Sequence, residues 1–150
     1  MPRPAAPRMP LTLACLAKGH RFAAATFEPS EAWVREYVAA IEDAAIANVG
    51  DYVPQMALAA LSIRALLEES PLPSGAIHVG QELTFKRPVV IGENLSVQAE
   101  VVSRGERQGW VLVGVGLSAA DRGGAVVMEG RATITFPVDP EADALKWKRT

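Results

Sequence analysis

The longest apolar run of the chain, residues 56–67, is interrupted only by Ser62 and Arg64. A run without a polar face at the 3.6-residue period predicts a helix that is buried on nearly all sides. Pro54 has the fixed φ angle that suits the start of a helix. The expected helix, residues 55–69, would be about 22 Å long at 1.5 Å per residue, which is too short to cross a bilayer.

Downstream of this helix the chain alternates apolar and polar residues at a period of two, which predicts strands. Their expected bounds are 77–87, 94–103, 110–119 and 125–136, and a glycine-containing hairpin loop is expected at 104–109. In the first of these strands the odd-numbered apolar residues are expected to share one face; they are Ile77, Val79, Leu83 and Phe85. In the last strand the corresponding face carries Val126, Met128, Ala132, Ile134 and Phe136.

Upstream of the central helix the pattern predicts one strand, residues 21–27, and one amphipathic helix. Ser30 is the expected N-cap of that helix, and Asn48 lies in the sequence that ends it. Apolar side chains recur at intervals of four residues along it, at Trp33, Tyr37, Ile41 and Ala45. The chain thus predicts an α+β domain in which five antiparallel strands surround one buried helix.

The composition is that of one globular domain, since 49% of the 150 residues are hydrophobic and 21% are charged. We expect the domain at 11–137, a mobile tail at 1–10 and a polar tail at 138–150. A net charge of −2 without a block of like charges argues against a nucleic-acid or polybasic membrane surface. Arg3 and Arg8 precede a short apolar stretch that loosely imitates a signal peptide, but the prolines before it argue against export.

The single cysteine, Cys15, excludes an internal disulfide and fits a reducing compartment, so the cytoplasm is the expected location. The two histidines, His20 and His78, are far apart in the chain and have no metal-ligand spacing, so we expect no metal site. The chain contains no nucleophile elbow, P-loop or dinucleotide-binding fingerprint, and we expect no cofactor.

Residues 75–95 contain Gly80-Gln81 followed by Phe85, then Arg87-Pro88, then Gly92-Glu93-Asn94-Leu95. Together they resemble the MaoC-like branch of the hotdog fold, which includes (R)-specific enoyl-CoA hydratases and fatty-acid-synthase dehydratase domains. Residues 19–22 and 53–56 are similar to that family's opening strand and to the start of its central helix. The resemblance covers about residues 15–137. It implies a hotdog fold, a five-stranded antiparallel sheet wrapped around one central buried helix, and a partner of the same fold.

The family's catalytic aspartate and histidine lie at the end of its first helix, where they activate a water. The resemblance places Asp43 on the aspartate, but Asn48 stands where the family has histidine, and the family's Asn-Pro pair is absent. The link from Asp43 to Pro54 is also shorter than in the family. Asp43 is therefore either a catalytic base or an exposed carboxylate at a helix end, and Asn48 either orients a water or caps the helix.

The resemblance implies an acyl thioester of coenzyme A or of an acyl carrier protein as substrate, bound at Pro54, Gln55, Met56 and Ala59. The acyl chain is expected to run beside Met56, Ala59 and Ala60, where the two alanines leave room along the helix. The backbone N–H groups of Gln55 and Met56 suit a thioester oxygen because the first turn of a helix leaves them without internal acceptors. The implied activity is hydration or dehydration of enoyl and 3-hydroxyacyl thioesters. The alternative is a catalytically silent subunit that pairs with an active hotdog and shapes its acyl tunnel.

Three other interpretations are weaker. A hotdog thioesterase needs a carboxylate on or near the central helix, and Glu68 and Glu69 lie at the wrong end of it. His78 lies at the start of a strand where the family often has a histidine without a catalytic role. Ser62 lies on the same helix face as Gln55, but a hydroxyl bonded back to a helix carbonyl is the simpler interpretation.

Overall fold

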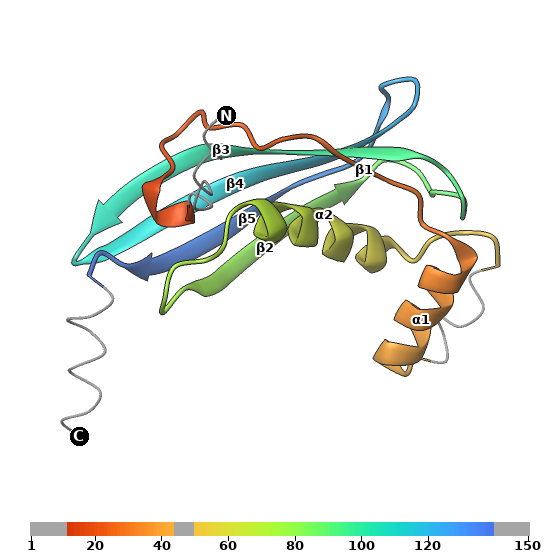
Figure 1. Cartoon of the computed structure of the whole chain (residues 1–150), viewed down its shortest axis with the longest axis horizontal. Coiled ribbons are helices and arrows are strands. Elements are labelled where there is room, and N and C mark those ends of the chain that lie inside the picture. Colours follow the sequence, from red (N-terminus) through yellow and green to blue (C-terminus); the bar gives the residue numbers. More distant parts are fainter. Residues whose placement is uncertain (1–11, 44–49, 140–150) are drawn as a thin grey trace, which may run out of the picture.

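The computed structural model describes residues 12–43 and 50–139 and has the architecture that the pattern predicts (Figure 1). The five strands form one antiparallel sheet in the order β1-β3-β4-β5-β2. The elements are a 3₁₀ helix η1 (Leu13–Cys15), β1 (Ala25–Phe27), α1 (Glu31–Ile41), α2 (Gln55–Glu69), β2 (Ile77–Phe85), β3 (Leu95–Arg107), β4 (Trp110–Asp121) and β5 (Val126–Pro137).

The central helix α2 has the predicted bounds and lies along one face of the sheet, as Figure 1 shows. The side chains that it buries against the sheet are Ala57, Leu58, Ala59, Ser62 and Leu66. Its other side is open, because Met56 is 55% exposed and both Ala60 and Arg64 are exposed. The prediction of a helix buried on nearly all sides is therefore wrong for the single chain, in which one sheet covers only one side of the helix.

Two apolar clusters fill the space between α2 and the sheet, one at each end of the helix. The cluster at the C-terminal half joins Leu66 to side chains of β3, β4 and β5, including Val113, which is fully buried. The cluster at the N-terminal half joins Ala57 and Leu58 to Met128 of β5. The start of α2 is thus embedded in the core on its sheet side.

The alternation predicted for β3 is confirmed: Leu95, Val97, Ala99 and Val101 are all buried. The prediction for β2 is wrong in its first half, where Ile77 and Val79 are 51% and 52% exposed. The cause is a β-bulge between His78 and Gly80, because an extra residue in one strand reverses the alternation beyond it. A second irregularity, in the pairing of Ala119 and Ala120 with β5, likewise leaves Val126 41% exposed instead of buried.

The hairpin between β3 and β4 is tighter than expected. Pairing continues to Arg107 opposite Trp110, so that only Gln108 and Gly109 form the turn, and the predicted loop at 104–109 is wrong. Both turn residues have positive φ angles, 53° and 79°, as a two-residue turn between right-twisted strands requires.

The first strand is also shorter than expected: β1 contains only Ala25–Phe27, and Arg21 forms an isolated bridge to Glu100. The segment before β1 is held to the sheet by Arg104, whose guanidinium donates to the carbonyl oxygens of Leu13, Ala14 and Leu16 at 3.4, 2.9 and 3.1 Å. This segment covers one edge of the core at the C-terminal half of α2.

The helix α1 begins as predicted, with the Ser30 hydroxyl accepting a hydrogen bond from the Trp33 N–H at 3.2 Å. It ends at Ile41, earlier than predicted, because Glu42 adopts a left-handed conformation with a φ angle of 53°. The predicted continuation through Ala45 to Asn48 lies outside the described residues. No helix in residues 12–43 or 50–139 is long and apolar enough to span a membrane.

Candidate functional site

The start of α2 combines backbone donors with an open apolar surface. Pro54 is the N-cap, and its carbonyl oxygen accepts from the N–H groups of Ala57 and Leu58 at 3.0 and 3.3 Å. Gln55 and Met56 are exposed, and their N–H groups lie in the first turn, which has no internal acceptors. With the positive end of the helix dipole behind them, these N–H groups suit a carbonyl oxygen that carries partial negative charge.

Two backbone hydrogen bonds fix the position of this helix start. The Val53 N–H donates to the Val89 carbonyl, and the Ile91 N–H donates to the Asp51 carbonyl, both at 2.8 Å. Tyr52 and Val90 form the bridge between these two bonds. The residues immediately before α2 are therefore bound as a short extra strand to the segment that follows β2.

That segment is held in turn by a cluster of three charged side chains. The guanidinium of Arg87 donates to both carboxylate oxygens of Glu93 and, at 2.9 Å, to Asp121 at the end of β4. Glu93 also accepts from the Val90 N–H at 3.2 Å, and Arg87 donates to the Pro88 carbonyl. The cluster therefore joins the segment 87–93 to the β4–β5 turn and holds the partner of the helix start in place.

The same contacts shift the acid–base equilibria of the cluster. Hydrogen bonds from Arg87 lower the pKa of Glu93 and of Asp121, because they stabilise the charged carboxylates. Asp121 is further stabilised as an anion by the N–H groups of Ala125 and Gly123. The two carboxylates raise the pKa of Arg87. All three groups are charged at neutral pH, so their role here is to position the loop.

The residues predicted to bind substrate divide between the two sides of α2. Gln55 and Met56 lie on the open side, at its start. Pro54 is buried, and Ala59 is 2% exposed within the core. A ligand that follows the open side from Met56 would therefore pass Ala60 instead of Ala59.

The predicted catalytic pair is not assembled by the described residues. Asp43 is an exposed residue two positions beyond the end of α1, and Asn48 lies outside the described residues. Figure 1 shows the C-terminal end of α1 pointing away from the sheet and from the start of α2. The catalytic roles of Asp43 and Asn48 thus remain predictions from the sequence.

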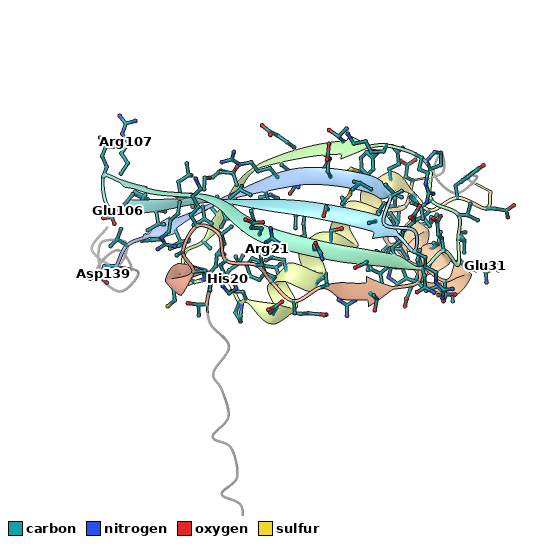
Figure 2. All side chains as sticks on the ribbon, turned by 90° about the horizontal axis from the view of Figure 1, so that it is seen from above. His20, Arg21, Glu31, Glu106, Arg107 and Asp139 are labelled. Atoms are coloured by element: carbon teal, nitrogen blue, oxygen red, sulfur yellow. The ribbon has the colours of Figure 1, made fainter. Side chains whose placement is uncertain are left out.

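The other polar candidates lie elsewhere. The Ser62 hydroxyl is fully buried and donates to the Leu58 carbonyl at 3.0 Å, as the simpler interpretation expected. His78 pairs with Ile134, a member of the core cluster at the opposite half of α2. His20 stacks edge-on against Phe22, and Figure 2 shows it far from Glu31, the first residue of α1. Neither histidine is at the start of α2.

A separate hollow of about 540 Å³ lies on the sheet face away from α2. Its lining includes charged residues that already form ion pairs, Arg21 with Glu100 at 3.2 Å and Glu129 with Lys86 at 2.6 Å. Figure 2 shows Arg21 on the stretch before β1, where it bridges to Glu100 of β3. Because these charges neutralise each other, the start of α2 is the better candidate site.

Sequence reasoning missed the Arg87 cluster, although the Arg-Pro and Gly-Glu motifs contain two of its three members. The spacing of Arg87 and Glu93 is consistent with a loop closed on itself by an ion pair. Asp121 is 34 residues from Arg87 in the chain, and only the order of the strands in the sheet brings the end of β4 close to the segment that follows β2.

Comparisons with known proteins agree with the fold and with the resemblance seen in the sequence. Over 85 residues the chain is 33% identical to a mitochondrial 3-hydroxyacyl-[acyl-carrier-protein] dehydratase, FERN, of Solanum lycopersicum. That match covers 57% of this chain, and the chain spans only half the length of the tomato protein. A comparison with models of protein families finds no match.

Among solved structures, the (R)-hydratase of A. caviae involved in PHA biosynthesis superposes with a TM-score of 0.69 at 25% identity, covering 82% of this chain and 98% of that one. The R-hydratase PhaJ1 of Pseudomonas aeruginosa superposes with a TM-score of 0.66 at 27% identity, covering 83% and 84%. The HadBC (3R)-hydroxyacyl-ACP dehydratase complex of Mycobacterium tuberculosis shares the fold, with a TM-score of 0.66 at 20% identity and coverage of 83% and 100%. The chain therefore has a hotdog fold, and it is similar in structure and sequence to MaoC-like dehydratases and (R)-hydratases.

Proposed function

We propose that this protein acts on acyl thioesters of coenzyme A or of an acyl carrier protein, hydrating enoyl groups and dehydrating 3-hydroxyacyl groups. The observation that carries the proposal is the likeness to two (R)-hydratases at 25% and 27% identity across more than four fifths of the chain. The 33% identity to an acyl-carrier-protein dehydratase supports the same chemistry. The open start of α2 is where the thioester binds.

In this proposal the N–H groups of Gln55 and Met56 donate to the thioester oxygen. Negative charge develops on that oxygen when water adds at C3, and donors fixed in advance stabilise it without reorganising. Asp43 takes a proton from the water as the water oxygen bonds to C3, and returns that proton to C2. The acyl chain follows the open side of α2 past Met56 and Ala60, both of which are exposed.

A second candidate is the silent subunit, which binds an active hotdog partner and contributes no acid or base. Two observations favour it: Asn48 replaces the family's histidine, and α1 directs its C-terminal end away from the start of α2 (Figure 1). An amide cannot exchange protons near neutral pH, and positioned acid–base catalysis contributes about 10²–10⁴ in rate. The missing imidazole alone would therefore raise the barrier by about 3–5 kcal/mol.

The experiment is the hydration of crotonyl-CoA by the purified protein, comparing wild type with Asp43→Asn. Glu42→Gln is the matched control, because it removes the neighbouring carboxylate at the same helix end. The hydratase proposal expects turnover that Asp43→Asn abolishes and Glu42→Gln preserves. Turnover that survives Asp43→Asn would rule out the role of Asp43, and absence of turnover together with tight binding of crotonyl-CoA would favour the silent subunit.

The proposal includes pairing with a second hotdog subunit. Within residues 12–43 and 50–139, the open side of α2 and the free edge of strand β2 have no cover, and uncovered apolar surface and strand edges are the usual sites of subunit contact. The HadBC neighbour is itself a complex of two chains.

A further inference from the structure

The sheet face away from α2 carries an exposed apolar patch at the end where β5 finishes. Trp110 and Leu112 of β4 are 39% and 50% exposed, and Ile77 of β2 is 51% exposed. The two β4 residues point away from α2, because Val111 between them is buried on the other face. Leu112 and Ile77 both pair with Thr135 of β5, so they lie in one row across the same face. These three side chains, Trp110, Leu112 and Ile77, form the apolar patch.

The next row along the same face consists of small residues. It runs across the sheet through Ser103, Gly114, Thr133 and Gly80. A Cβ atom at Gly80 would meet only Thr133, at 3.9 Å, so the space above Gly80 is free. Gly114 is covered by the guanidinium of Arg131, which donates to the Ser103 hydroxyl at 2.6 Å. This glycine row has room for a large flat side chain, and a guanidinium beside it suits an aromatic ring.

One row further on, Glu82 is an exposed carboxylate without a cation. Among residues 12–43 and 50–139 it forms no ion pair and no side-chain hydrogen bond. Arg131 lies opposite Glu82 in the pairing of β2 with β5, but its guanidinium is directed to Ser103. Glu82 also lines the hollow of about 540 Å³ on this face. The face thus offers, in order, an apolar surface, a space for a ring and a free negative charge.

We propose that residues 140–150 of the same chain fold back over this face in an extended conformation. Leu145 then lies on the apolar patch, Trp147 lies over the glycine row, and Arg149 pairs with Glu82. Side chains two residues apart in an extended segment point to the same side, so all three can face the sheet together. The segment removes apolar surface from water and neutralises the free carboxylate.

The spacing of the segment matches the spacing of the sheet. Four residues separate Leu145 from Arg149 in the sequence. Four residues of β5 likewise separate Thr135, in the row of the patch, from Arg131, which lies opposite Glu82. At about 3.3 Å per residue both intervals are about 13 Å. The three contacts can therefore form at once without bending the segment.

The segment belongs to the same chain because it leaves the sheet beside the patch. The Val138 N–H donates to the Gly109 carbonyl at 2.9 Å, which holds the end of β5 next to Trp110. The following residues, Asp139-Pro140, are a sequence that favours a turn, so the chain can reverse its direction there. A short tether gives a segment an effective concentration in the millimolar range, which a separate chain at micromolar concentration does not match.

Disulfide formation tests this placement. In a Cys15→Ser background, the pair Leu112→Cys with Leu145→Cys should form a disulfide within one chain. The control pair is Arg107→Cys with Leu145→Cys, because Figure 2 shows Arg107 at the same end of the sheet as Asp139. A docked segment should form the first disulfide at least about tenfold faster than the second. Equal rates, or a disulfide between two chains detected by mass spectrometry, would overturn the proposal.

A charge exchange then tests the register. Glu82→Arg and Arg149→Glu each bring like charges together and should slow formation of the first disulfide by about two- to fivefold. The two changes combined should restore the rate, whereas Glu36→Arg, at an exposed carboxylate of α1, should leave it unchanged. Circular dichroism confirms that each variant is folded. If the combined variant is as slow as either single one, Arg149 does not meet Glu82 and the proposal is wrong. The face lies away from α2, so this outcome is independent of the proposed thioester chemistry.

Discussion

Replacing Gly130 with alanine should destabilise the sheet where β5 meets β2. Gly130 lies opposite Leu83 of β2 and Leu117 of β4. A Cβ atom at position 130 would lie 2.3 Å from the backbone carbonyl oxygen of Glu82 and 2.9 Å from the Leu83 side chain. Ordinary contacts of a Cβ atom begin near 3.4 Å, so β2 would have to move by about 1.1 Å. Because the closest atom belongs to the backbone, a rotamer change cannot relieve the contact.

Two opposing effects set the size of the change. Overpacking of this kind costs about 1–3 kcal/mol. Removing a glycine restricts the unfolded chain and returns about 0.5–1 kcal/mol. The net loss is therefore between zero and about 2.5 kcal/mol in the free energy of unfolding, which for a domain of this length lowers Tm by up to about 10 °C.

Urea unfolding followed by circular dichroism at fixed protein concentration measures this loss. Gly105→Ala is the matched control: Gly105 lies in β3, and a Cβ atom there would meet nothing within 4 Å. It should be neutral or stabilise by up to about 1 kcal/mol, because only the restriction of the unfolded chain acts. A Gly130→Ala protein as stable as Gly105→Ala would show that β2 and β5 are not in the register described here.

Two further predictions concern the loop and the N-terminal segment. Hydrogen bonds from Arg87 lower the pKa of Glu93 below its ordinary 4.5 and the pKa of Asp121 below its ordinary 3.8. The two carboxylates therefore stabilise the fold at any pH above their ordinary pKa values, and this stabilisation is lost as the pH falls through their lowered pKa values. Urea midpoints at a series of pH values should therefore fall less steeply in acid for the double variant Glu93→Gln, Asp121→Asn; an equal slope would contradict the cluster. Arg104→Lys should speed hydrogen exchange of the Leu16 amide, because one ammonium group cannot reproduce the hydrogen bonds that the guanidinium makes to three carbonyl oxygens. Arg107→Lys, at the hairpin, is the control and should leave this exchange rate unchanged.

The sequence correctly predicted those parts of the fold that are determined by residues adjacent in the chain. The bounds of α2 follow from Pro54 and from the apolar run, the start of α1 follows from the Ser30 cap, and the inward face of β3 follows from strict alternation. In each case the residues that form the signal are adjacent in the chain. The order of the strands, by contrast, entered through the resemblance to hotdog proteins.

The errors occur where the outcome depends on residues far apart in the chain. The bulge at Val79 depends on how β2 pairs with β5, some fifty residues later, and its only local signal is the adjacent Gly80, which the sequence-based prediction did not use. The apolar composition of α2 predicted that the helix is buried on nearly all sides. The position of the sheet decides which side of the helix is covered, and the Met56 side chain lies on the uncovered side. The burial of the Gln81 amide without a hydrogen-bond partner among the described residues could not be predicted either, because it depends on how β2 packs in the sheet.

The choice between hydratase and silent subunit comes down to the position of α1. Its N-terminal part packs on the core cluster at the start of α2, through Trp33 and Tyr37, while its C-terminal end points away (Figure 1). A base must lie within hydrogen-bond reach of the water that it activates, so catalysis by Asp43 requires that end to approach Gln55. Turnover abolished by Asp43→Asn would therefore establish two things at once, the identity of the base and a position of α1 in the working protein that differs from the one described here. Binding of crotonyl-CoA without turnover would agree with the observed position of α1, in which Asp43 is not near Gln55.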